Sequence, residues 1–480
     1  MSSGRAIGAG GAWLLLAQVG GLVAQFIYTA ITARLMDPAD FAIYAIAIII
    51  ANLVAIFSVA GLGQSVARLE TLDKPLLRSL STISFVVGIF AMVVIVIPAP
   101  LWAGLWRNSE ATPAIALVGA TAFFAPAVGL ISGYMRRVGR FRTLAIVQLV
   151  STVLSFGVSL LMVLIWRSPL ALVAAAVLLQ WFSLIGLSIA TRARMLPGKL
   201  DWAKSAPHLA FSWRVTAANI MSFALENVPR LLVSRYSGPT PLGLWNRADV
   251  VATVPFDRVN TALSQALYPE YRHDLLTTDR ISRRWPDMLA VAAWMSVPAS
   301  ALVAGAAPAL VPFLLGEGWV ASVPFVTVLA LASAGRGVSM QLASALEAIG
   351  RFRWIWISQS VLLAALFPVV ALMVITADVW IAISFALIFP ILRHVIQLVF
   401  CFRERLFSPR AILEAYWQPI FAGVLLFCGA RAVTIAVASC GVWAQIGCLA
   451  VFFGSVLLVA WLLRGRLSAW TLLTRYISKK

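Results

Sequence analysis

Charged side chains interrupt two neighbouring apolar stretches between Phe211 and Arg272, which are separated by a tight turn rich in glycine and proline. A charged group in the middle of a bilayer costs about 3 kcal/mol on insertion scales, so such groups usually face a water-filled cavity or pair with one another. We therefore expect both stretches to cross a membrane and to form one wall of a hydrated cavity. The charges are Arg214, Glu226, Arg230, Arg235, Arg247, Asp249, Asp257 and Arg258.

Helical spacing pairs some of these charges. Glu226 precedes Arg230 by four residues, the order and spacing that favour an ion pair within a helix. This pair either neutralises itself for structural reasons or belongs to a functional polar face. The same two interpretations apply to Arg258, because a buried pair with Asp257 is its structural alternative.

Two further arginines and two acids complete the candidate set. Arg336 lies near the middle of a later apolar stretch, and Arg393 lies beside His394 in another. A carboxylate inside a membrane protein can bind a sodium ion or take up a proton. Glu226 and Asp257 are therefore candidates for coupling transport to a proton or sodium gradient.

The elements that must position these charges are membrane helices. The chain has 480 residues, of which 61% are hydrophobic and 11% are charged, and this composition is too apolar for a soluble globular protein. Apolar stretches of about 20 residues, the length that spans a bilayer, predict an all-α integral membrane protein with about 14 transmembrane helices. The stretches begin at Ala6, Phe41, Leu80, Pro113, Thr143, Leu170, His208, Leu244, Pro286, Ala321, Ile355, Val379, Ala415 and Ala444.

The formal net charge of +19 would suggest a nucleic-acid partner in a soluble protein. Here most basic residues lie in alternate short loops, and the intervening loops hold only Arg34, Arg107 and Arg167. Positively charged loops stay on the cytoplasmic side of a membrane. Both termini are therefore predicted to be cytoplasmic, and no nucleic acid is expected to bind.

Two parts of the chain repeat one another. The sequence GRFR occurs at Gly139–Arg142 and again, 211 residues later, at Gly350–Arg353. Closer to the N-terminus, ARLMDPADFAIY from Ala33 aligns with SRYSGPTPLGLW from Ser234. These matches fall at equivalent ends of equivalent predicted spans, which indicates a duplicated bundle.

The repeat sets the predicted domain organisation. With six spans in each copy, both copies begin on the same side of the membrane, so a pseudo-twofold axis along the membrane normal relates the two bundles. We predict an N-lobe of transmembrane helices 1–6 over residues 1–205 and a C-lobe of helices 7–12 over residues 206–410. Residues 411–480 are predicted to form two further helices and a basic cytoplasmic tail.

Three segments resemble a known family. They are the turn ARLMDPADFAIYAIA after the first span, GLGQSVARLE at the end of the second, and RYSGPTPLGLWNRADVVATVPFDRVNTALSQALYPEY around the seventh and eighth. These segments are similar to the Wzx-type polysaccharide exporters of the multidrug/oligosaccharidyl-lipid/polysaccharide (MOP) flippase superfamily. The resemblance covers roughly residues 5–410 and implies a V-shaped pair of six-helix bundles.

This resemblance also implies a function. Such exporters move an undecaprenyl-diphosphate-linked oligosaccharide from the cytoplasmic to the periplasmic leaflet of the bacterial inner membrane by alternating access. The product is used for exopolysaccharide, capsule or O-antigen assembly, and association with a polysaccharide polymerase and export machinery is expected.

Arginine suits the diphosphate of such a lipid, because its planar fork binds phosphate oxygens in pairs and stays charged. We expect Arg258 and Arg336 to hold the diphosphate and the first sugars, with Arg214, Arg230 and Arg393 in support. Arginines outnumber acids within these spans, so the cavity would attract an anionic headgroup. The polyprenyl tail is expected to stay among the membrane lipids.

Two other functions remain alternatives. A cation-coupled multidrug exporter of the same superfamily needs an acidic or aromatic cavity for cationic drugs, whereas the charges here are mainly basic. A membrane saccharide polymerase or ligase resembles a different plan, with a large periplasmic loop, and only short loops are predicted here. The chain has no Walker-type phosphate loop, HExxH motif or nucleophile elbow, so we expect neither an enzyme nor a bound cofactor or metal.

Overall fold

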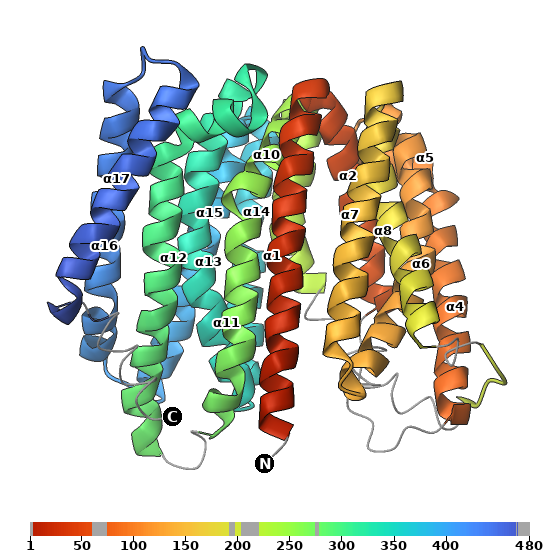
Figure 1. Ribbon diagram of the computed structural model, residues 1–480, viewed down its shortest axis with the longest axis horizontal. Helices are drawn as coiled ribbons and strands as arrows, with labels where there is room; N and C mark the ends of the chain where they lie inside the picture. Colours follow the sequence, from red (N-terminus) through yellow and green to blue (C-terminus); the bar gives the residue numbers. More distant parts are fainter. Residues whose placement is uncertain are drawn as a thin grey trace. The chain divides into compact units, whose positions relative to one another are not determined.

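The computed structural model describes residues 3–59, 74–191, 197–202, 220–273, 278–466 and 468. All regular elements within these ranges are helices (Figure 1), which confirms the predicted all-α class. The helices form two compact units, Met1–Gly243 and Leu244–Lys480. The predicted lobe boundaries at residues 205 and 410 stay a prediction, and Arg214 lies outside the described residues.

The first unit contains seven labelled α-helices and a short π-helical turn, η2 (Val233–Ser237), which follows a helical run from residue 220. The helices are α1 (Ser3–Leu35), α2 (Pro38–Val59), α4 (Lys74–Val96), α5 (Ala99–Leu105), α6 (Thr112–Arg137), α7 (Phe141–Trp166) and α8 (Pro169–Ala190).

The helix α10 (Pro239–Ala252) runs from the end of the first unit into the second. The remaining helices of the second unit are α11 (Val254–His273), α12 (Thr278–Leu315), α13 (Val323–Ala348), α14 (Phe352–Thr376), α15 (Val379–Arg403), α16 (Pro409–Ala436) and α17 (Val442–Leu462).

Twelve helices among the described residues are long and apolar enough to cross a membrane. They correspond to twelve of the fourteen predicted spans, so the protein is a multi-pass membrane protein. The other two predicted spans, from His208 and Leu244, fall partly outside the described residues and partly on the charged helices α10 and α11. The count of fourteen and the orientation of the termini therefore stay predictions.

The first unit is held together by α4, α6 and α8, with α2 and α7 packed beside them. Its core includes Leu80, Leu130, Met135 and Leu144. Helices α4 and α6 approach so closely at Gly88 that a Cβ there would overlap the carbonyl oxygen of Phe123. Small residues permit such contacts between membrane helices, where close packing replaces hydrophobic burial as the stabilising interaction.

The second unit is organised around α12, which packs extensively against α13 and α16, while α13 packs against α15. One end of this unit contains a buried aromatic cluster in which Trp285 lies edge-on to Tyr271, with ring centroids 5.5 Å apart, and 6.5 Å from Phe407. Edge-to-face contacts of this kind stabilise beyond the apolar area that they bury. The cluster therefore fixes the ends of α11 and α12 relative to one another.

The two GRFR segments have the same backbone geometry. Gly139 and Gly350 have φ angles of +73° and +74°, a left-handed conformation that glycine adopts without steric strain. In each turn the amide of the next arginine donates to a carbonyl five residues earlier, at 3.0 Å for Arg140 and 2.9 Å for Arg351. Helix α13 begins and ends 211 residues after α6, so this part of the chain is structurally repeated.

Candidate ligand-binding site

Three helices of the second unit place charged side chains close together. Arg336 Nη1 on α13 lies 3.9 Å from Asp257 Oδ2 on α11, and the two side chains are 20% and 45% exposed. The separation and partial exposure make this a loose ion pair, whose net contribution to stability is small. Since Arg336 lies near the middle of a 26-residue helix, the pair occupies a depth at which a membrane protein rarely keeps charge without a function.

Arg393 on α15 joins this group through a serine. Its Nε donates a 2.7 Å hydrogen bond to Ser339 Oγ on α13, and Ser339 in turn lies 3.3 Å from Gln397 Oε1. The guanidinium carbon is 5.5 Å from the centre of the Phe389 ring, which is within cation–π range. Ser339 is one helical turn from Arg336, so both arginines approach the same side of α13.

A buried polar network fixes the helices that carry these charges. Ser296 Oγ on α12 donates to Asn260 Oδ1 on α11 at 3.0 Å, and Gln341 Nε2 on α13 donates to the Asn260 carbonyl at 3.0 Å. Ser264 Oγ donates to Gln341 Oε1 at 3.1 Å. Because satisfied buried hydrogen bonds specify one arrangement of helices, this network sets the rotation of α11 and α13, and with it the directions of Asp257 and Arg336.

A glycine makes this network possible. A Cβ at position 337 would overlap Ser296 Oγ and would lie 2.8 Å from Asn260 Nδ2. Gly337 is the residue directly after Arg336. The close approach of three helices therefore occurs beside the candidate ligand-binding arginine.

A break between two helices lies next to Asp257. Helices α10 and α11 meet at Thr253, two residues before Pro255, and proline lacks the N–H that a continuous helix needs. The amide of Thr253 donates to the Asp249 carbonyl at 2.8 Å, and the amide of Asp257 donates to the Thr253 carbonyl at 3.0 Å. Asp257 thus lies in the first turn of α11, on a segment whose direction the proline has altered.

The other predicted site residues are placed differently. Arg258 is exposed on α11, directly after Asp257, and Asp257 pairs with Arg336 at 3.9 Å. Glu226 is exposed and Arg230 is partly buried, both in the helical run of the first unit. The described cluster of Asp257, Arg336 and Arg393 therefore contains three of the predicted residues, all from the second unit.

Sequence reasoning missed the polar network and one further link between helices. His394 Nε2 lies 3.0 Å from the Tyr416 hydroxyl, which connects α15 to α16. Isolated Asn, Gln and Ser residues within apolar spans were the available signal, since such residues often form hydrogen bonds between membrane helices. Their partners, however, lie up to 81 residues away along the chain.

The fold defines a class of membrane transport protein. A solved structure of the lipid II flippase MurJ, in an inward closed conformation, covers 95% of this chain and 99% of its own chain with a TM-score of 0.70. The two sequences are only 12% identical, so this similarity establishes the fold alone.

Residues 31–324 match the family described as polysaccharide biosynthesis protein, and the chain belongs to this family. The teichuronic acid biosynthesis protein TuaB of Bacillus subtilis is 24% identical over 293 residues, which are 61% of this chain and 60% of TuaB. The lipopolysaccharide biosynthesis protein WzxC of Escherichia coli is 22% identical over 350 residues, 71% of this chain and 70% of WzxC. The resemblance to Wzx-type proteins of the MOP superfamily is thereby confirmed.

Proposed function

We propose that this protein flips an undecaprenyl-diphosphate-linked oligosaccharide from the cytoplasmic to the periplasmic leaflet of a bacterial inner membrane by alternating access. The product would enter exopolysaccharide, capsule or O-antigen assembly. Family membership, the MurJ-like fold and the names of both relatives support this proposal. The observation that carries it is the approach of Arg336 and Arg393 to one side of α13.

The arrangement suggests how a diphosphate would be held. Guanidinium groups bind phosphate oxygens through two parallel hydrogen bonds and remain charged at any physiological pH. Ser339 already orients Arg393 through its Nε, at 2.7 Å. A diphosphate would then compete with Asp257 for Arg336, because their 3.9 Å separation leaves that pair weak.

Asp257 has a second role in this proposal. In the absence of lipid it serves as a counter-ion for Arg336, and when the diphosphate takes over that arginine the carboxylate can accept a proton or a sodium ion. Glu226, exposed in the first unit, is the other candidate for coupling. Exchange of partners at Arg336 would link substrate binding to ion binding.

The proposal includes the predicted topology and partners. Fourteen spans would be arranged as a six-helix lobe over residues 1–205, a second over 206–410 and two helices with a basic tail over 411–480, with both termini cytoplasmic. Arg214, Arg230 and Arg258 would support substrate binding from the seventh and eighth spans. A polysaccharide polymerase and export machinery are the expected protein partners.

A cation-coupled multidrug exporter is the second candidate, because MOP proteins include both functions. Its substrates are cations, and a site with Arg336 and Arg393 close together would repel them. We therefore favour the anionic lipid, and a transporter in preference to a polymerase or ligase.

Deletion and complementation in the source organism test the function. Loss of the protein should remove the surface polymer and cause lipid-linked oligosaccharide to accumulate on the cytoplasmic side. Wild-type protein and Arg410→Ala should restore export, since Arg410 is 87% exposed and pairs only with its helical neighbour Glu414 in the described contacts. Arg336→Ala and Arg258→Ala should not restore it, although both proteins reach the membrane. Normal export with both variants would contradict the assignment, and normal polymer in the deletion strain would contradict the function.

A further inference from the structure

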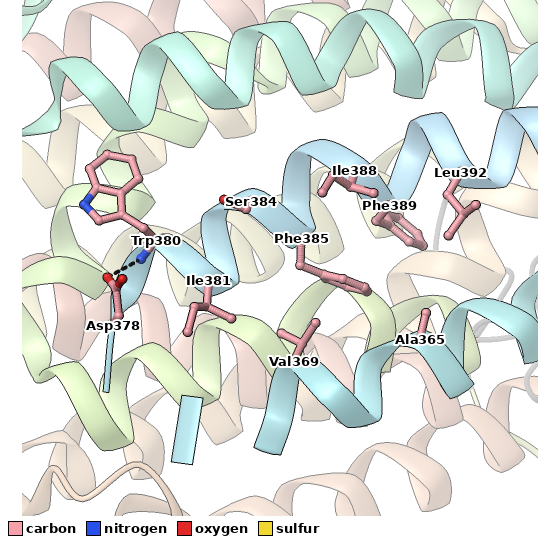
Figure 2. Close-up of a pocket in the computed structure, with 10 residues that line it drawn as sticks. All are labelled: Ala365, Val369, Asp378, Trp380, Ile381, Ser384, Phe385, Ile388, Phe389 and Leu392. Atoms are coloured by element: carbon pink, nitrogen blue, oxygen red, sulfur yellow. Dashed lines mark hydrogen bonds between the residues drawn. The ribbon is translucent and has the colours of Figure 1, made fainter. Parts of the chain in front are cut away.

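An apolar groove of about 510 Å³ runs between α14 and α15 in the second unit. Figure 2 shows Ala365 and Val369 of α14 facing Phe385 and Phe389 of α15 across it. Ile388, which also lines the groove, is 55% exposed. The groove is therefore apolar along its length and open at its side.

The two ends of the groove differ in chemistry. At one end Asp378 accepts a 3.0 Å hydrogen bond from the Trp380 amide (Figure 2), so this carboxylate caps the first turn of α15. At the other end the lining residues Phe389 and Leu392 adjoin Arg393, whose guanidinium carbon lies 5.5 Å from the Phe389 ring. The second end is thus bordered by a cation.

The second arginine of the candidate site lies at the same depth. A Cβ at Gly335 on α13 would lie 3.1 Å from Ile391 Cγ1 on α15. Arg336 follows Gly335, and Leu392 follows Ile391, so Arg336 is level with the arginine end of the groove. Arg393 and Arg336 together place positive charge where the apolar lining ends.

The length of the groove matches one leaflet. From Trp380 to Leu392 the α15 backbone rises about 18 Å at 1.5 Å per residue. A bilayer has a hydrocarbon core of about 30 Å, so one leaflet is about half of that. The groove can accordingly hold the length of hydrocarbon chain that extends from the middle of the membrane to one interface.

We propose that this groove binds the first isoprene units of the lipid whose diphosphate is held by Arg336 and Arg393. The proposal rests on the function proposed above and assigns the part of the protein that carries the tail during transport. An ordinary phospholipid fits less well, because its headgroup belongs at the membrane interface and not at the middle of the helices. A transported lipid, by contrast, must bring its headgroup to that depth.

The side opening is consistent with a long polyisoprenoid. Only the segment next to the diphosphate needs the protein, because the rest of the chain can lie in the surrounding hydrocarbon. Exposed Ile388 and Ile391 on α15 would contact the chain at the edge of the groove. Chain length should consequently affect binding up to the capacity of the groove.

Native mass spectrometry of the full-length protein in detergent tests this proposal, with undecaprenyl diphosphate and geranyl diphosphate as ligands. Wild-type protein should bind the longer lipid more tightly. Ile388→Trp and Ser384→Trp, which place a ring in the groove from exposed positions, should weaken binding of undecaprenyl diphosphate about tenfold, the loss expected when apolar surface of roughly one side chain is no longer buried. Binding of geranyl diphosphate should change much less.

Two control variants separate the outcomes. Ile375→Trp, on α14 at a position that is 80% exposed and outside the groove, should bind both diphosphates as the wild type does. Arg336→Ala should weaken both. If both groove variants fold and bind undecaprenyl diphosphate normally, the groove assignment is wrong while the flippase function stands.

Other results would overturn the proposal in different ways. If the groove variants lose only co-purified phosphatidylglycerol, the groove holds structural lipid and not the substrate. If wild-type protein binds neither diphosphate, the proposed function itself fails. Thermal unfolding of each variant in detergent should be measured alongside, and Ser384→Trp replaces Ile388→Trp if the latter does not fold.

Discussion

The segments α6–α8 and α13–α15 share a backbone plan but not a chemistry. Both have the same glycine turn, at Gly139 and Gly350, and both begin their third helix after a polar side-chain cap. At the offset of 211 residues, Arg336 on α13 corresponds to Ala125 on α6, and Arg393 on α15 corresponds to Phe182 on α8. One copy is therefore apolar at the positions where the other carries its arginines.

The difference indicates what each level of the sequence controls. The turns depend on glycine and on cap residues, because those positions require particular backbone angles and donors. The middle of each helix is free to vary provided that it packs, so a charge can be added there if its neighbours supply hydrogen bonds. Here the second copy has the neighbours, namely Ser339, Gln397 and Asp257.

Transferring the charge to the first copy should have the largest effect. Ala125 is 8% exposed, and Ala125→Arg would bury a cation with no partner designed for it, which should lower the free energy of unfolding by about 3 kcal/mol or more. Thermal unfolding in detergent measures the change. Ala125→Met, with a side chain of similar length but no charge, is the control. Equal stability of the two variants would mean that α6 accommodates charge as readily as α13.

Filling the close contact beside Arg336 should have the next largest effect. Gly337→Ala places a methyl group against Ser296 and Asn260, and overpacking of this kind should destabilise by about 2 kcal/mol. Gly157→Ala on α7 is the matched control, since nothing lies within 4 Å of a Cβ there, and it should be neutral or slightly stabilising. The melting temperatures of the two variants should differ clearly. A Gly337→Ala protein as stable as the wild type would show that the network tolerates separation of α11, α12 and α13.

Removing the hydroxyl that orients Arg393 should reduce transport more than stability. Ser339→Ala deletes the 2.7 Å bond to Nε, and loss of one such bond to a charged group should lower export about tenfold. Ser358→Ala on α14 removes a buried hydroxyl that bonds only to the local Ile355 carbonyl in the described contacts, and export should persist. The amount of surface polymer, normalised to protein in the membrane, measures both. Unchanged export with Ser339→Ala would argue against a role for Arg393 in binding.

The turn glycines should give the smallest effect and the same effect in both copies. Gly139→Ala and Gly350→Ala force a side chain onto backbone with φ near +73°, which should cost about 1 kcal/mol each. Paired melting curves test the equivalence of the two turns. A large difference between the two shifts would indicate that the turns share geometry without sharing their contribution to stability.

Much of the architecture could be predicted from the sequence. Twelve of the fourteen predicted spans are found as helices, and the GRFR repeat predicted two turns that prove to be alike. The charged seventh and eighth spans are the part that composition alone does not settle, since their charges lower the apolarity by which a span is recognised. For the site, the sequence selected Asp257, Arg336 and Arg393 among seven residues, but it did not show that these three belong together.

The sequence by itself determined that the chain crosses a membrane repeatedly, repeats a helical segment and carries arginines at mid-span, because hydrophobicity, turn chemistry and charge are properties of local residues. Only the tertiary structure decided that Asp257 pairs with Arg336 and not with its neighbour Arg258, that Ser339 orients Arg393, and that an apolar groove ends beside that arginine. The physical reason is that partners on different helices depend on which helix faces meet. Those faces are chosen by close packing at residues such as Gly337 and by buried hydrogen bonds between distant segments, and no local pattern encodes them.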